Sequence, residues 1–320
     1  MAINKNFDNG DFESLNLTDL IDMSRVLSHK NFGRSINFYY TSVYFPAVSI
    51  TGSSCALNCK HCRGILIKRL IDTKTPKKLI RACMEFHKEG SRGVLITGGC
   101  TNEGKVPLNN FLDAIREIKD KTDLILFAHT GVVNYEDAKG LKYSGIDGVC
   151  VDIVGSEDTT REIYGIELYP EDYIKTLRAF ERAGMGNISP HICVGLHYGK
   201  PRHELNALDI ISYIKPSNVV IIGLTNLDGT PMRDIRINPE DLIRILCLAR
   251  FKFKDSYISL GCARGKGYIR EEIDKLAIRA GVNNIAIPTS SAYKEANKLN
   301  LKIREFGACC AVLPSQLQLE

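Results

Sequence analysis

The chain has 320 residues, 11 cysteines and a formal net charge of +5. Its apolar runs are all far shorter than the ~18 residues of a membrane-spanning helix. The polar start, MAINKNFDNGDFES, does not read as a signal peptide, and an odd cysteine count argues against a disulfide framework. We therefore expect a cytoplasmic protein that neither enters membranes nor, with its scattered Lys and Arg, binds nucleic acid.

The first 46 residues precede the main pattern. Leu20, Met23 and Leu27 recur at helical spacing and predict a helix over residues 18–29, with Gly33 after its end. We expect residues 1–46 to form an N-terminal helical extension or lid, with a partner-docking arm as the alternative.

Strand-like and helical segments then alternate over residues 47–320, which we expect to form one domain. Eight such alternations predict an α/β fold, a parallel (β/α)8 TIM-type barrel, with a partial (β/α)6 barrel as the alternative. The expected strands are residues 48–51, 93–98, 124–129, 148–154, 189–196, 219–225, 257–261 and 284–288. The expected helices are residues 77–88, 108–121, 135–141, 171–183, 205–214, 239–250, 269–280 and 292–299.

Three cysteines follow the first of these strands in the run SSCALNCKHCRG. Cys55, Cys59 and Cys62 are spaced C-x3-C-x2-C. Three neighbouring thiolates can hold three irons of a [4Fe–4S] cluster, leaving the fourth iron for another ligand. The alternatives are a zinc knuckle or incidental buried cysteines, but structural zinc normally takes four ligands in paired spacings.

Other polar and sulfur-containing residues fall at the ends of later strands, where barrel enzymes carry their chemistry. Cys150 and Asp152 share one face of their strand, and His191 and Cys193 share one face of the next. The opposite, apolar faces would pack on helices, so these side chains should point into the barrel lumen. Further residues at strand ends are Thr97, Gly98, Gly99, Cys100, His129, Gly195, His197 and Cys262; Cys309 and Cys310 follow in the C-terminal tail.

The triplet resembles the signature of the radical S-adenosylmethionine (SAM) enzymes. In that family the open iron of a [4Fe–4S] cluster binds SAM, and an electron from the cluster cleaves SAM to a 5′-deoxyadenosyl radical. The resemblance implies that His61 packs near the adenine. It also implies that the TGG segment of Thr97, Gly98 and Gly99 receives the methionine amino group, although Cys100 replaces the Glu of the family's motif.

The same resemblance suggests four further SAM contacts. Asp152 would bind the ribose or the amino group, with an ordinary hydrogen-bonded carboxylate as the alternative. Arg161 would reach the carboxylate of SAM, or else form a surface ion pair. Gly195 and His197, in GLHYG, lie where the family has a glycine-bearing motif against the adenine.

Four cysteines are candidates for a second iron–sulfur cluster. Sulfur-inserting members of the family carry an auxiliary cluster as the sulfur donor, and distant residues can converge on one rim of a barrel. We expect Cys100 and Cys262, with Cys309 or Cys310, to ligate such a cluster; the alternative is four isolated buried thiols.

Residues 44–313 resemble the biotin-synthase-like group of this family. Blocks such as LITGGCTNEGKVPL, LGCARGKGYIREEIDKLAIRAGV and CCAVLP look like the two-component, archaeal-type lipoyl synthases. That resemblance implies sulfur insertion into a protein-bound octanoyl chain. The implied partners are a companion radical SAM subunit, an octanoylated carrier protein or peptide, and an electron donor such as ferredoxin. The alternatives are a radical SAM enzyme without sulfur insertion (a mutase, lyase or metallocofactor-maturation enzyme) and a non-catalytic iron–sulfur partner subunit.

Overall fold

A single parallel sheet forms the centre of the computed structural model, which describes residues 15–317. The sheet has 11 strands in the order β11-β1-β10-β9-β8-β7-β6-β5-β4-β2-β3. All of its strand pairs in the described residues are parallel. The strands are β1 (Ser35–Tyr39), β2 (Ala47–Ser49), β3 (Ile71–Asp72), β4 (Gly93–Thr97), β5 (Ile125–His129), β6 (Gly148–Asp152), β7 (Ile188–Val194), β8 (Asn218–Gly223), β9 (Tyr257–Leu260), β10 (Asn284–Ala286) and β11 (Lys302–Phe306).

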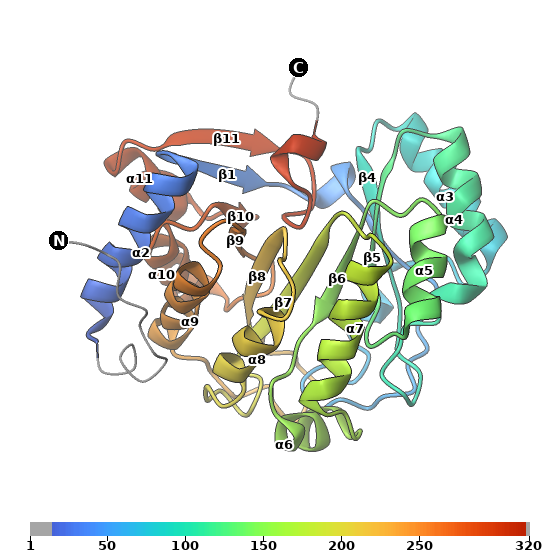
Figure 1. Cartoon of the computed structure of the whole chain (residues 1–320), viewed down its shortest axis with the longest axis horizontal. Coiled ribbons are helices and arrows are strands. Elements are labelled where there is room, and N and C mark those ends of the chain that lie inside the picture. The colour runs from blue at the N-terminus through green and yellow to red at the C-terminus, as the bar shows by residue number, and fades with distance from the viewer. Residues whose placement is uncertain (1–14, 318–320) are drawn as a thin grey trace.

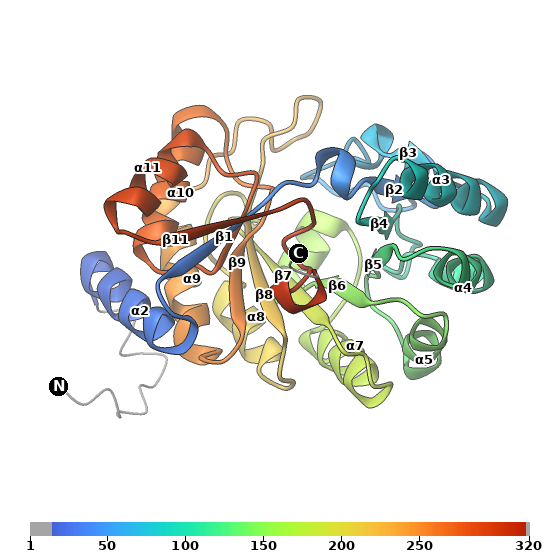
Figure 2. The same ribbon diagram turned by 90° about the horizontal axis from the view of Figure 1, so that it is seen from above.

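Helices surround the outer, convex side of this sheet (Figures 1 and 2). Each longer helix buries one apolar stripe against the strands, as expected for a sheet whose connections are helical. No helix within residues 15–317 is long and apolar enough to cross a membrane. The helices are α2 (Leu17–Phe32), α3 (Pro76–Lys88), α4 (Leu112–Lys121), α5 (Tyr135–Tyr143), α6 (Glu157–Thr159), α7 (Pro170–Arg182), α8 (Glu204–Ile211), α9 (Pro239–Lys252), α10 (Gly267–Arg279) and α11 (Ser290–Lys298).

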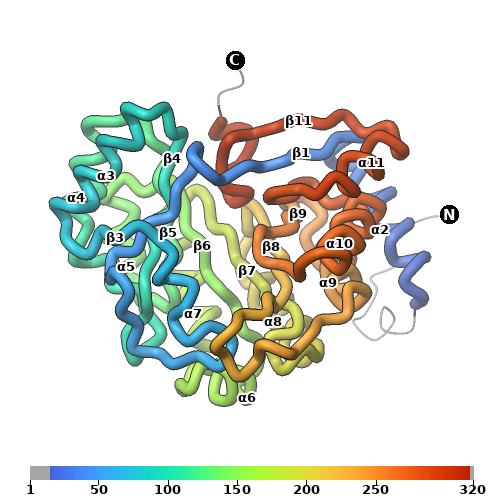
Figure 3. Tube along the Cα trace, turned by 180° about the vertical axis from the view of Figure 1, so that it is seen from behind, coloured from blue at the N-terminus to red at the C-terminus, as the bar shows by residue number. Residues whose placement is uncertain are grey.

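The predicted parallel α/β fold is confirmed, and the sheet takes the open, partial-barrel form. All eight expected strands are present as β2 and β4–β10. The sheet does not close because β1 occupies the edge of β10 that a closed barrel would pair with β2. Strand β11 then pairs with the other edge of β1, and the two run side by side along the top of the molecule in the view of Figure 3.

The N-terminal segment contributes to the sheet as well as preceding it. The helix expected over residues 18–29 is α2, capped by the Asn16 side chain, which accepts a hydrogen bond from Asp19 N. Residues 35–39, which we expected in a separate extension or lid, form β1 instead. This part of the segment therefore belongs to the central sheet, because β1 is hydrogen-bonded to β10 and β11. Residues 1–14 lie outside the described part.

The C-terminal tail fills the inside of the sheet at the end where the strands begin. Asn187 and Asn218, at the starts of β7 and β8, donate hydrogen bonds to the carbonyl groups of Ala311 (3.1 Å) and Cys310 (3.0 Å). Tyr39 donates its hydroxyl to Val312 O at 3.0 Å. The tail lies inside the curve in Figure 2, so it plugs that mouth of the lumen.

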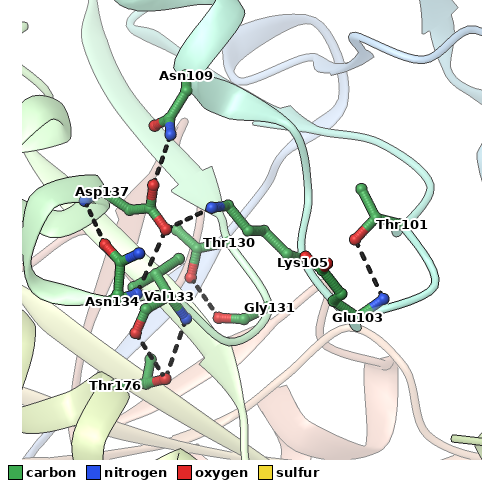
Figure 4. A network of polar contacts seen from close by, with 10 residues as sticks. All are labelled: Thr101, Glu103, Lys105, Asn109, Thr130, Gly131, Val133, Asn134, Asp137 and Thr176. Atoms are coloured by element: carbon green, nitrogen blue, oxygen red, sulfur yellow. Dashed lines mark hydrogen bonds and ion pairs between the residues drawn. The ribbon is translucent and has the colours of Figure 1, made fainter.

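A polar network fixes two loops at the opposite end, after β4 and β5 (Figure 4). Asp137 lies at the centre and accepts hydrogen bonds from Lys105 and Asn109, both at 2.5 Å. Its backbone N–H in turn donates to Asn134, which caps α5. Partial burial acts to raise the pKa of Asp137, but the hydrogen bonds from Lys105 and Asn109 outweigh burial and lower it.

Candidate functional site

The cysteine triplet lies in an irregular loop directly after β2. Its turns are closed by backbone hydrogen bonds from Cys62 N to Cys59 O (3.2 Å) and from Ile65 N to Cys62 O (2.8 Å). The sulfur atoms of Cys59 and Cys62 and a ring nitrogen of His61 all lie within 4.8 Å of one another. All three cysteines have free thiols, so the loop is available to bind metal.

Two thiols of the triplet, Cys59 and Cys62, interact directly. Cys59 donates a hydrogen bond to Cys62, which lowers the pKa of Cys62 and raises that of Cys59. Burial and the charges of Cys62, Cys55 and Cys100 add to the rise at Cys59. Cys55 therefore lies close to this pair although it is outside the 4.8 Å group. A thiolate next to two further thiols fits an iron–sulfur cluster, whose irons bind sulfur as thiolate.

The segment of Thr97, Gly98 and Gly99 supports this loop directly. Gly99 donates its N–H to the Thr51 hydroxyl at 2.7 Å. A Cβ on Gly99 would lie 2.6 Å from Cys55 Cα, and one on Gly98 would lie 3.1 Å from the Thr51 side chain. A glycine is thus needed at position 99, where the backbone of the loop approaches the end of β4 too closely for a side chain, whereas the contact at Gly98 is tight. Their expected contact with the amino group of SAM stays a prediction.

A cavity of about 380 Å³ opens beside the triplet, at the C-terminal ends of the strands. His61 lines it and packs against Tyr164, with ring centroids 5.5 Å apart and the rings tilted by 44°. The buried Nδ1 of His61 has no hydrogen-bond partner among the described residues. The cavity walls are largely apolar and include Leu66, Arg69, Asp152, Cys193, Leu196, Ile222, Leu224, Leu227, Cys262, Arg264, Lys266 and Arg270.

Two of the eight expected SAM contacts line this cavity, whereas six do not, the segment of Thr97, Gly98 and Gly99 included. His61 and Asp152 are in its wall. Arg161 instead forms ion pairs with Glu157 and Asp158, which is the surface alternative considered for it. His197 hydrogen bonds to the Thr159 hydroxyl (3.1 Å), and Gly195 forms a turn with φ of 75°.

The four cysteines expected at a second cluster fall into three places. Cys100 lies beside the triplet, and its carbonyl accepts a hydrogen bond from Ala56 N at 2.8 Å. Cys262 lines the cavity, whereas Cys309 and Cys310 lie in the tail plug. Burial and the nearby Cys309 raise the pKa of Cys262. Within residues 15–317, no three of these four form a group as compact as that of Cys59, His61 and Cys62.

The lumen wall between the cavity and the plug carries a second compact group. His129, Cys150 and His191 each place one potential ligand atom within 4.8 Å of the other two. Burial, followed by the charge of His129, lowers the pKa of His191 to about 4, so this imidazole is neutral. The alternation of residues predicted that these side chains point inward, but it could not show that they meet.

The basic residues around the cavity were not predicted from the sequence. Arg264 is fully buried and pairs with Asp274 at 2.6 Å, while Arg69 and Lys266 are exposed beside it. Arg270 donates to Cys262 O at 3.1 Å. Arg69 ends a short 3-10 turn after the triplet, whereas the other three residues lie in or just before α10, so only the fold brings them together.

Comparison with known proteins gives matches to one family. Residues 49–209 match the model of the radical SAM superfamily. Biotin synthase of Clostridioides difficile (strain 630) is 27% identical over 247 residues, covering 73% of this chain and 71% of that protein. Biotin synthase of Rickettsia felis is 27% identical over 248 residues, covering 74% of this chain and 77% of that protein.

Two solved structures share the fold. Methylornithine synthase (PylB) matches with a TM-score of 0.67 and 14% identity, over 94% of this chain and 95% of that one. The [FeFe]-hydrogenase maturase HydG from Carboxydothermus hydrogenoformans matches with a TM-score of 0.63 and 17% identity, over 86% and 65%. At such identities the likeness concerns the fold alone.

Proposed function

Because the family match spans half of its residues, the chain belongs to the radical SAM superfamily, and on that premise we propose that it inserts sulfur into a protein-bound octanoyl chain as one subunit of a two-component lipoyl synthase. The family implies a [4Fe–4S] cluster and SAM, and the triplet loop fits the cluster. Similarity to biotin synthases supports sulfur insertion as the reaction class. The blocks that resemble lipoyl synthases support the octanoyl substrate.

One observation carries the proposal: the triplet stands at the mouth of an apolar cavity that also contains thiols. Leu196, Ile222 and Leu224 give the cavity walls that suit an unbranched acyl chain. Cys193 and Cys262 share those walls. A reaction that joins sulfur to an unactivated carbon needs both features in one chamber.

The chain's own residues divide the remaining tasks. When bound, the cluster and SAM supply a radical that removes hydrogen from carbon. The cluster would be held by Cys55, Cys59 and Cys62. His61, whose ring packs against that of Tyr164, would contact SAM. Asp152 offers a carboxylate in the same wall, and the apolar side chains keep water away from the reacting carbon.

The basic rim fits the expected carrier. Arg69, Lys266 and Arg270 surround the opening through which a carrier-bound chain would pass. Cations around an opening attract an acidic protein surface and raise its rate of encounter. We infer that an octanoylated carrier docks here, while the companion subunit and the electron donor bind elsewhere.

An anaerobic assay tests this function. The protein is incubated with SAM, dithionite, an octanoyl-lysyl peptide and the companion subunit, and the products are measured by mass spectrometry. We expect 5′-deoxyadenosine together with a peptide that gains one or two sulfur atoms. The Cys59→Ala variant is the control and should give neither product.

Other outcomes would point to the alternatives. Formation of 5′-deoxyadenosine with no sulfur gained by any acylated peptide would favour a radical SAM enzyme of another kind. No 5′-deoxyadenosine, with or without the companion, would favour a non-catalytic subunit. Iron analysis adds an independent measure, since one [4Fe–4S] cluster gives about four irons per chain and a second cluster of that type gives about eight.

A further inference from the structure

Three neighbouring strands each direct one metal-binding side chain to the same point in the lumen. His129 is the last residue of β5, Cys150 is in the middle of β6, and His191 is in β7. In the strand register His129 lies opposite Cys150, and His191 lies opposite Asp152, two residues further along the same face. The sheet itself therefore holds the three ligand atoms within 4.8 Å of one another.

His191 is oriented as metal-binding histidines usually are. Its Nδ1 lies 2.9 Å from Ser189 O. A carbonyl oxygen only accepts hydrogen bonds, so Nδ1 carries the proton and Nε2 keeps its lone pair. Histidines that bind metals typically give their other ring nitrogen to a carbonyl or a carboxylate in this way. His129 Nδ1 faces the Asp152 carboxylate at 3.8 Å, which is an ion-pair distance and too long for a hydrogen bond.

The group is enclosed but not sealed off. Cys150 is fully buried and His191 is 7% exposed, whereas the His129 side chain is 25% exposed. Asp152 connects His129 to the wall of the cavity. Below the group, Cys309 of the tail packs against the core cluster that contains Cys150. An ion bound here would thus have one side toward the cavity and a further thiol nearby.

We propose that His129, Cys150 and His191 form a second metal site, separate from the triplet, that binds a borderline divalent ion such as iron(II) or zinc(II). Two imidazoles and one thiolate suit these ions, whereas magnesium and calcium require oxygen ligands. Three protein ligands leave a position for Cys309 or for an added ligand such as sulfide. Only the use of that position as a sulfur source rests on the proposed function; the binding of the ion does not.

Cobalt(II) is a suitable probe, because its absorption spectrum reports both thiolate ligation and coordination number. The test uses untagged, full-length protein in which Cys55, Cys59 and Cys62 are all replaced by Ala, so that the triplet cannot contribute. Anaerobic titration should give one cobalt per chain with a thiolate-to-cobalt charge-transfer band. Absence of binding, with an unchanged circular dichroism spectrum, would overturn the proposal.

Single substitutions in that background identify the ligands. Cys150→Ser should remove the charge-transfer band, and His191→Asn or His129→Asn should weaken cobalt binding by ~10-fold or more. Cys83→Ala and Cys247→Ala replace buried helix cysteines and serve as matched controls, with no effect expected. His129→Asn changes a partly exposed residue and keeps the test decisive if the buried variants do not fold.

The competing possibility is that Cys262, Cys309 and Cys310 bind the cobalt, and it is tested in the same way. A Cys262→Ala/Cys309→Ala/Cys310→Ala variant should still bind cobalt through the lumen group, with a changed spectrum if Cys309 is the fourth ligand. Complete loss of binding there, with binding kept in His129→Asn and Cys150→Ser, would overturn the assignment.

The natural ion is distinguished by two parallel reconstitutions of the same background variant. One uses iron and sulfide, the other zinc alone, and bound iron, sulfide and zinc are counted after desalting. Retention of either metal in a His129-dependent and Cys150-dependent way supports the site. Iron without sulfide, or zinc alone, would leave the site standing but remove it as the sulfur source, whatever the activity of the unaltered protein.

Discussion

The triplet loop and the lumen group hold similar ligand atoms in opposite ways. In the loop, three cysteines within eight residues meet because a short chain folds back on itself. In the lumen, His129, Cys150 and His191 are spread over more than sixty residues and meet because β5, β6 and β7 are in register. Spacing alone reveals the first kind of site, whereas only a correct sheet reveals the second.

The two regions should therefore differ in their sensitivity to mutation. The loop depends on a close approach at one glycine and on its own turns, so local changes should remove it while the sheet stays folded. The lumen group depends on strands that also form the core, so its geometry should survive unless the sheet itself is disturbed.

The largest difference is expected for activity after loss of one loop thiol. Replacing Cys59 by Ala should abolish 5′-deoxyadenosine formation, because two thiolates do not hold the cluster. The thermal unfolding temperature should change little, and the cobalt site of the lumen should remain. Chromatographic detection of 5′-deoxyadenosine checks the first point, and Cys83→Ala is the control. Full activity in Cys59→Ala would show that the loop is not the cofactor site.

Arg264 tests how strongly the sheet that supports both regions depends on one buried ion pair. Its buried guanidinium pairs with Asp274 and donates to the carbonyl oxygens of Gly261 (2.7 Å) and Ala286 (2.9 Å), joining the ends of β9 and β10. Arg264→Met leaves the Asp274 carboxylate buried and unpaired, which should lower the free energy of unfolding by ~3–5 kcal/mol. Urea denaturation measures this, with the exposed Arg233→Met as a control. A loss similar to that control would show that the pair contributes little.

Gly99 distinguishes the loop from the lumen more finely. A Cβ there would lie 2.6 Å from Cys55 Cα and closer still to the Ser54 carbonyl oxygen, so Gly99→Ala must displace the loop. We expect a loss of ~1–3 kcal/mol of stability and lower iron content after reconstitution, with the lumen cobalt site unchanged. Gly186→Ala has open space around its Cβ and is the matched control. Normal iron content in Gly99→Ala would mean that the loop tolerates this shift.

The smallest effect on metal binding should come from the Asp137 network, which is in contact with neither metal group, so that its loss should change stability alone. Its lowered pKa means that the ionised carboxylate stabilises the fold above the pKa of the unfolded chain, and that this contribution disappears as the pH falls through the folded-state value. Asp137→Asn should therefore cost ~1.5–3 kcal/mol at pH 7 and progressively less below about pH 4. Denaturation at several pH values checks this. A cost that is constant with pH would mean that the charge is not what matters.

The sequence predicts the repeating part of the fold well, because strand and helix periodicities are local. Pro76, with the Thr75 cap, marks the start of α3 in the sequence and in the structure alike. Strands β1, β3 and β11 were not expected. Ile71–Asp72 is too short and exposed to show a pattern, while β1 and β11 depend on pairing with segments about 250 residues away.

The candidate site likewise contains residues that the sequence predicts and others that only the fold brings together. The triplet was expected from its spacing, and His61, Gly99 and Asp152 from the family resemblance. In the structure His61 and Asp152 line the cavity, whereas Gly99 packs against the triplet loop. Arg161 could not be resolved from the sequence, because its neighbours Glu157 and Asp158 satisfy it one helical turn away. Tyr164 and the basic rim were missed because their elements are far apart in the chain, and no local periodicity shows which residues the fold brings together.

The hydrogen-bonded tail limits the routes into the lumen. Residues 309–312 are fixed across the starts of β7 and β8 and close that end, so the cavity is reached from the side where the triplet lies. Under the proposed function, SAM and a carrier-bound acyl chain would share this single entrance, and the acyl chain would enter with its methyl end first.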